Sequence, residues 1–130
     1  MSIMIQLAHL LSLYKTGNMM EKQEDKFKVR SKIWIEDKTG KVAFGLGRFK
    51  ILEAVDRLGS MNLAANELSM SYRSVWCRIR ESEERIGKKL VVRSGKGSRL
   101  TSFAKDLLEQ FTDLDAKLKE EADKIFGKLL

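Results

Sequence analysis

The sequence has one cysteine and one histidine among its 130 residues. A single cysteine cannot form an internal disulfide, and Cys77 and His9 alone cannot make the cluster that zinc or haem requires. One histidine also leaves no set of nucleophile, base and acid of the serine-hydrolase kind. We therefore expect no metal, no cofactor and no disulfide within the chain.

Glycine-rich phosphate loops are missing as well. No glycine-rich stretch follows an expected strand and opens a helix, as a P-loop does, and Gly45-x-Gly47 is too short for a dinucleotide fingerprint. The adjacent carboxylates Glu83-Glu84 fall on a helix face where solvation is the default. The sequence therefore predicts a protein that is not an enzyme and has no catalytic residues.

Long hydrophobic runs are also absent. The apolar stretch Met1–Tyr14 is too short to cross a bilayer and lacks the basic region of a secretory signal. We interpret residues 1–20 either as a short helix that packs on a dimer partner or as a leader before a start at Met19 or Met20. Because 33% of the residues are charged and 43% are hydrophobic, we expect a folded domain in the cytoplasm, with no membrane contact.

Positive charge is what the chain has in excess, with 25 Lys and Arg against 18 Asp and Glu. Residues 71–100 hold nine basic and three acidic residues, whereas 1–70 hold eleven and eight, and 101–130 five and seven. A basic centre favours a polyanionic partner, because neutralising phosphates releases condensed counterions. Charge alone leaves a solvated basic surface as the alternative.

The apolar pattern first predicts strands. Alternation over Phe27–Ile35 predicts a half-buried strand, and Val42–Phe44 predicts a second strand that returns after the turn Asp37–Gly40. The spacing then changes to three and four residues, which predicts a helix from Phe49 to Leu58 that ends at Gly59.

Two further helices follow at once. Ser60 or Asn62 can cap a short one that contains Ala64 and Ala65, and Ser71 can cap a longer one that runs to about residue 86. Two short helices joined by a tight turn, the first rich in alanine, have the shape of a helix-turn-helix. The short turn and the small side chains therefore indicate this motif.

The third helix has an inner and an outer face. Val75, Ile79 and Ile86 are expected to face inward. The outer face can read DNA, because Arg pairs bidentately with guanine and Ser and Tyr donate hydrogen bonds to bases or phosphates. We assign to this face Tyr72, Arg73, Ser74, Cys77 and Arg78.

Each of these residues also has an ordinary structural interpretation. Arg78 can pair with Glu81 or Ser74 on a solvated face, and Cys77 can be a small filler. Trp76 is expected to pack in the core or at a hinge. Three short helices also occur in modules that bind no DNA.

A small basic hairpin is predicted directly after this helix. Its strands are Lys89–Ser94 and Arg99–Thr101, and its tip is Gly95–Ser98. Such a wing can lie on the phosphate backbone or enter the minor groove, although a Gly-Lys-Gly tip is also an ordinary solvated turn. We assign to wing or phosphate contacts Ser60, Ser71, Arg93, Lys96, Arg99 and Thr101.

The last predicted element is a helix over residues 102–130, which Thr101 can cap. An apolar stripe at spacings of three and four runs along it, with one four-residue step. For the part up to Phe111, packing on the helix 49–58 is the alternative, but from Leu114 onward a symmetric partner is the simplest cover. We assign to a homodimer interface Ala104, Leu107, Phe111, Leu114, Leu118 and Ile125.

Taken together, these motifs resemble a known family over about residues 27–115. The pattern Gly59-Ser60-Met61, then Gly87, then Arg99-Leu100-Thr101 resembles LysR-type winged-helix domains. The segments Phe44-Gly45-x-Gly47-Arg48 and Met70-Ser71-Tyr72-Arg73 with Trp76 are similar to the DNA-binding domain of ModE-type molybdate-responsive regulators.

This resemblance implies an α+β fold, mainly helical with small β-hairpins, that binds double-stranded DNA as a homodimer and regulates transcription. Residues 21–101 are then the winged helix-turn-helix and residues 102–130 the dimerisation helix. ModE-type regulators carry a further oxyanion-binding region that these residues do not include, so molybdate binding is not carried over. The alternative is a winged-helix module that binds protein or RNA without reading a DNA sequence.

Overall fold

The computed structural model describes residues 27–129, in two compact units. The larger unit is Lys32–Asp115, and the described part of the smaller one comprises residues 27–31 and 116–129. The segment 1–20, which we interpreted as a leader or a short helix, lies outside the described residues.

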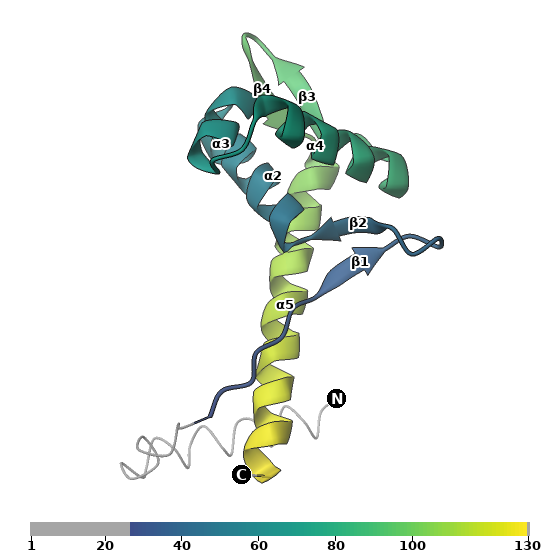
Figure 1. Cartoon of the computed structure of the whole chain (residues 1–130), viewed down its shortest axis with the longest axis vertical. Helices are drawn as coiled ribbons and strands as arrows, with labels where there is room; N and C mark the ends of the chain where they lie inside the picture. Colours follow the sequence, from purple (N-terminus) through teal and green to yellow (C-terminus); the bar gives the residue numbers. More distant parts are fainter. Residues whose placement is uncertain (1–26, 130) are drawn as a thin grey trace. The chain divides into compact units, whose positions relative to one another are not determined.

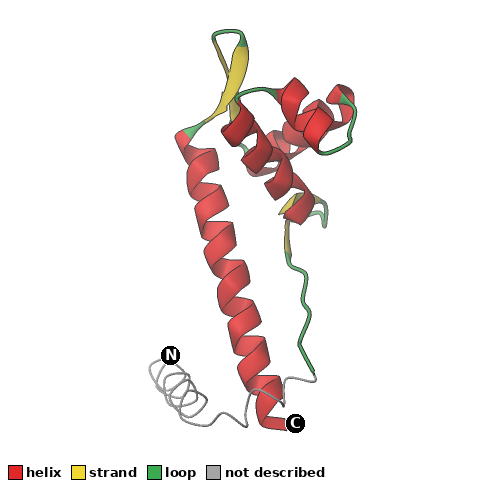
Figure 2. Cartoon of the chain, turned by 90° about the vertical axis from the view of Figure 1, so that its left-hand side faces the viewer, coloured by secondary structure: helices red, strands yellow, loops and turns green. Residues whose placement is uncertain are grey.

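Helices dominate the described residues, with two small antiparallel hairpins between them (Figures 1 and 2). This confirms the predicted fold class. In chain order the elements are β1 (Trp34–Glu36), β2 (Val42–Gly45), α2 (Leu46–Leu58), α3 (Met61–Glu67), α4 (Tyr72–Ile86), β3 (Val91–Ser94), β4 (Gly97–Leu100) and α5 (Ser102–Leu129).

The first hairpin corrects the prediction of a strand from residue 27. The strand β1 begins only at Trp34, which pairs with Gly45, and Phe27 is 68% exposed. No strand faces the alternating residues before Trp34, because β2 ends at Gly45, and Val29 N donates instead to the Asp123 carboxylate (3.3 Å). A strand needs a partner for its backbone hydrogen bonds, and side-chain alternation alone cannot supply one.

The helix boundaries follow the predicted caps more closely than the apolar pattern. Helix α2 begins at Leu46, three residues before the apolar period, and ends at Gly59, whose φ of 70° is left-handed. Ser60, and not Asn62, caps α3, since its Oγ accepts a hydrogen bond from Leu63 N (3.2 Å). Ser71 caps α4 in the same way, with Ser74 N as donor at 3.0 Å.

One hydrophobic core joins the three short helices, both hairpins and the start of α5. Ala64 and Ala65 are buried, and their small side chains let α3 approach its neighbours closely. Phe111 of α5 meets Phe44 edge-on (ring centroids 5.2 Å apart) and lies 5.8 Å from Phe49. The first part of α5 is therefore held by its own domain.

The stripe on α5 consequently has two environments. Ala104 and Phe111, which we assigned to a dimer interface, are buried in the core, as the alternative interpretation of this half states. Leu114, Leu118 and Ile125 are 44%, 43% and 62% exposed. Three large apolar side chains of the stripe are thus exposed from Leu114 onward in the described part of α5.

Candidate nucleic-acid interface

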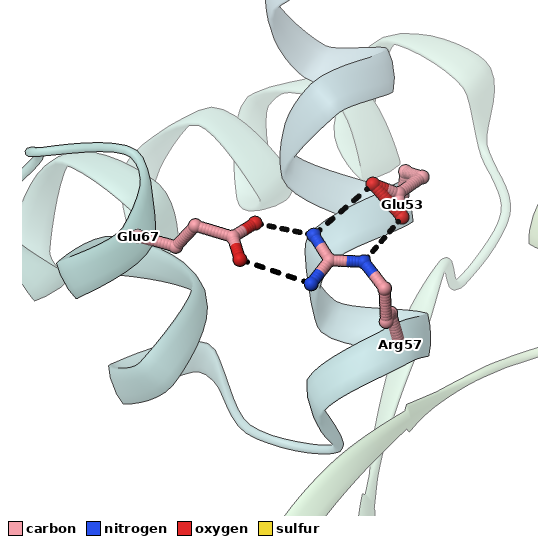
Figure 3. A network of polar contacts seen from close by, with 3 residues as sticks. All are labelled: Glu53, Arg57 and Glu67. Carbon is pink, nitrogen blue, oxygen red and sulfur yellow. Dashed lines mark hydrogen bonds and ion pairs between the residues drawn. The ribbon is translucent and has the colours of Figure 1, made fainter.

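An exposed arginine of α2 binds to α3, the first helix of the helix-turn-helix (Figure 3). Arg57 of α2 donates hydrogen bonds to Glu53 on its own helix (Nε to Oε2, 3.0 Å) and to Glu67 of α3 (Nη1 to Oε1, 2.9 Å). The hydrogen bond from Arg57 holds the pKa of Glu67 below its ordinary value of 4.5, and both carboxylates raise the pKa of Arg57. This clamp secures α3, against which α4 then packs.

The lowered pKa of Glu67 predicts a pH dependence. A carboxylate with a depressed pKa stabilises the fold above its unfolded pKa and loses that contribution as the pH falls through its folded pKa. At pH values above about 5, Glu67→Gln should therefore lower the melting temperature by a small amount. In acid, the melting temperatures of the variant and the wild type should become equal. Thermal melts of both proteins across pH 3–7 would measure this, and a difference that grows in acid would contradict it.

Two arginines fix α4 on its other side. Arg48 of α2 donates to Glu81 (2.9 Å), and Arg85 donates to the backbone carbonyl of Val42 (2.6 Å). Burial lowers the pKa of Arg48, and the Glu81 carboxylate opposes that shift. Glu81 is thus engaged with Arg48, which corrects its suggested pairing with Arg78.

The outer face of α4 presents the residues we assigned to it. Tyr72, Arg73, Ser74 and Arg78 are exposed, and Cys77 is half-buried. Val75 and Ile79 are buried beneath them, as predicted. The same helix therefore separates a core face from a polar, basic face.

Trp76 corrects a prediction, because it is 45% exposed and not part of the core. The residue lies about 100° around the helix from Val75, which places it on the flank that carries Tyr72 and Arg80 at spacings of four. Helical spacing could have indicated this exposure, but the size of the indole favoured a buried interpretation.

The wing differs slightly from its predicted form. Ser94 pairs with Gly97, so the turn is only Gly95 and Lys96, and the predicted tip residues Gly97 and Ser98 belong to β4. Gly95 has a φ of 58°, the left-handed conformation that a two-residue hairpin turn favours. Arg93, Lys96 and Arg99 are exposed on the wing.

A backbone contact seats the wing on the turn between α2 and α3. Ser98 N donates to the carbonyl of Gly59 (2.9 Å), and a Cβ on Gly97 would lie 2.2 Å from that same oxygen. Only glycine at position 97 permits this approach. At the far end of the wing, the Thr101 hydroxyl donates to Lys89 O (2.8 Å) and accepts from Ala104 N, which confirms Thr101 as the cap of α5.

Glu83 ties α4 to the wing, a role that sequence reasoning missed. The carboxylate is buried, and its Oε2 accepts hydrogen bonds from Leu90 N (2.8 Å) and Val91 N (3.3 Å). Its other oxygen lies 3.6 Å from Arg80 Nη1 and 3.7 Å from Lys89 Nζ. The available signal was a glutamate four residues after Ile79, on the inward stripe of α4.

These anchors create a groove of about 290 Å³ between the wing, the start of α3 and the start of α4. The groove brings together four predicted contact residues and adds Asn62, which was not predicted in this role. Arg73, Arg78 and Arg99 lie outside it. The lining residues are Ser60, Met61, Asn62, Tyr72, Val91, Val92, Arg93, Lys96, Gly97 and Ser98.

The described residues hold neither a cluster of metal-ligating side chains nor a helix suited to cross a membrane. No three His, Cys, Asp or Glu side chains gather there as a potential metal site. None of the described helices has both the length and the apolar composition of a membrane span.

The sequence of this domain is similar to known bacterial regulators. Residues 46–105 match the model of the bacterial regulatory helix-turn-helix proteins of the lysR family. The chain is 29% identical over 87 residues to the molybdenum transport protein ModE of Azotobacter vinelandii and 35% identical over 78 residues to the transcriptional regulator YofA of Bacillus subtilis. These alignments cover 63% and 60% of this chain but only 32% and 27% of the two relatives.

A solved structure shares the fold. The DNA-binding domain of CbnR, determined in complex with DNA, superposes with a TM-score of 0.53 at 24% identity, covering 65% of this chain and 97% of that one. The matched family is one of regulators, in agreement with the prediction that the chain is not an enzyme. Residues 46–105 therefore form a winged helix-turn-helix DNA-binding domain of the LysR type.

Proposed function

We propose that the chain is a sequence-specific, homodimeric transcriptional regulator that inserts α4 into the major groove and lays the wing on the backbone or in the minor groove. The observation that carries this proposal is the groove in which Lys96 and Arg93 of the wing converge with Tyr72 of α4. Lys and Arg supply phosphate contacts, and the exposed first turn of α4 supplies base contacts.

In this proposal α4 contacts the bases and so recognises the DNA sequence, and the wing contacts the phosphate backbone. On α4, the reading residues are Tyr72, Arg73, Ser74, Cys77 and Arg78. The proposed phosphate contacts are Ser60, Ser71, Arg93, Lys96, Arg99 and Thr101. Ser60, Ser71 and Thr101 also serve as helix caps, so their contact with DNA would come in addition to a structural role.

The proposed domain organisation is a DNA-binding domain at 21–101 and a dimerisation helix at 102–130. The uncovered leucines of α5 support this division. A symmetric pair of such helices would hold two copies of α4 about one DNA turn apart.

We further propose a ModE-type subgroup for this domain. Two features support this relationship. The hairpin β1–β2 precedes the part that matches the lysR family, and the motif Met70-Ser71-Tyr72-Arg73 is similar to that of ModE-type regulators. ModE of Azotobacter vinelandii is one of the relatives that align with this chain, at 29% identity over 87 residues. Molybdate binding is not part of the proposal.

Selection of duplex fragments from random DNA at moderate salt tests the function directly. A regulator should enrich one sequence with partial two-fold symmetry, and its affinity should fall steeply as salt rises. Retention of RNA or of no nucleic acid under the same conditions would overturn the proposal and favour the interaction-module alternative.

Arg73→Ala and Lys96→Ala should have different effects, one on sequence preference and the other on affinity for all sequences. Arg73→Ala is expected to cost about 1–3 kcal/mol on the best site and to relax sequence preference. Lys96→Ala should weaken all sequences alike and reduce the salt slope by about one unit. Fluorescence anisotropy on the best and on scrambled duplexes measures both effects, and an Arg73→Ala protein with unchanged preference would contradict the assignment.

A further inference from the structure

Arg80 of α4 has two neighbours that orient its side chain, which is 48% exposed. Its guanidinium carbon lies 5.6 Å from the centre of the Trp76 ring, within the range of a cation–π contact. On the other side, Arg80 Nη1 lies 3.6 Å from Glu83 Oε1. An aromatic face and a carboxylate thus hold one long basic side chain in place.

The N–H groups of the Arg80 guanidinium nevertheless remain available to a ligand. The 3.6 Å separation from Glu83 is an ion pair but too long for a hydrogen bond. Within the described part of the chain, the Arg80 guanidinium makes no hydrogen bond. The cation–π contact with Trp76 uses none of the guanidinium donors in an N–H···O hydrogen bond, and the guanidinium fork matches a phosphate bidentately.

The carboxylate does not cancel the local positive charge. Glu83 faces both Arg80 and Lys89, whose Nζ lies 3.7 Å away, so the three groups together keep one positive charge. Glu83 is also held by two backbone N–H donors at the start of the wing. It therefore acts as a fixed support for Arg80 and not as a competing surface anion.

Helical spacing relates this cluster to Tyr72, the residue of α4 that lines the groove. Tyr72, Trp76 and Arg80 recur every four residues and lie on one flank of the helix, and Tyr72 lines the groove beside the wing. Arg80 thus adds positive charge to the flank of α4 whose first residue, Tyr72, lines the groove.

We propose that Arg80 is a phosphate-contacting residue of the DNA interface and that Trp76 is the positioning residue that orients it. This inference rests on the proposed function and deepens it. It places a backbone contact on the flank of α4, outside the reading residues, and gives the exposed tryptophan a role other than base recognition.

The test is salt-dependent binding of the full chain to the selected duplex and to a scrambled one. Arg80→Ala should reduce the slope of log affinity against log salt by about 0.9 and weaken both duplexes roughly five- to tenfold at 0.1 M salt. Arg80→Lys should keep the slope because it keeps the charge. Lys38→Ala removes one charge at the exposed turn of the first hairpin, which belongs neither to α4 nor to the wing, and should change neither quantity.

The positioning role has its own readout. Trp76→Leu should weaken both duplexes, Trp76→Phe should restore most of the binding, and the Trp76→Leu loss should disappear in the Arg80→Ala background. Melting curves of each variant verify that it is folded.

An Arg80→Ala slope equal to that of wild type would overturn the contact. A Trp76→Leu loss undiminished in the double variant would overturn the positioning role. Absence of duplex binding by the wild-type chain would instead refute the proposed function itself.

Discussion

Replacing Leu114 and Leu118 with Glu is expected to yield a monomer that binds its best DNA site at least 100-fold more weakly. Both side chains are more than 40% exposed, so the substitution leaves the core of the domain intact. It places two carboxylates in the stripe that a partner helix would cover, where burying unpaired charge is costly. Loss of the dimer removes the gain of about 10²–10⁴ that two linked half-site contacts provide.

Sedimentation and anisotropy would measure the two effects separately. Ala116→Glu combined with Lys117→Gln changes the net charge by the same amount at exposed positions off the stripe and should leave a dimer with full affinity. A wild-type chain that is monomeric at tens of micromolar, roughly where a specific dimer should persist, would contradict the dimer model.

Glu83→Ala is expected to lower the free energy of unfolding by about 2–4 kcal/mol, because it leaves the N–H groups of Leu90 and Val91 without their acceptor. The melting temperature should fall by roughly 10–15 °C. Glu83→Gln should lose less, since an amide oxygen still accepts a hydrogen bond. Chemical denaturation followed by circular dichroism provides the measurement.

Glu84→Ala is the matched control for this prediction. The neighbouring glutamate is exposed, and its removal should change stability by less than about 0.5 kcal/mol. Equal losses for Glu83→Ala and Glu84→Ala would show that the buried carboxylate is not what ties α4 to the wing.

Much of this fold could be predicted from the sequence, because it depends on interactions between residues close together in the chain. Ser60, Ser71, Gly59 and Thr101 marked helix boundaries correctly, because caps depend on hydrogen bonds and backbone conformations within a few residues. The apolar stripe of α4 predicted its buried and exposed faces for the same reason. The basic residues on and around α4 likewise indicated a polyanionic partner.

The first hairpin and Trp76 needed the tertiary structure. Alternation predicted a long strand from Phe27, but the length of β2 limits the pairing to residues from Trp34 onward. The indole of Trp76 was expected inside, yet Val75 and Ile79 already fill the space under α4. In both cases the outcome depends on which partner surface is available, and a pattern of residue types does not contain that information.

The sequence by itself determined the succession of helices, the caps and the basic centre, since these depend on neighbours within one helical turn. Only the tertiary structure decided how the wing sits, because Gly97 meets Gly59 and Glu83 meets Leu90 through contacts between separate elements. It likewise divided the stripe of α5 at Leu114, where the core of the domain ends and the exposed apolar surface begins.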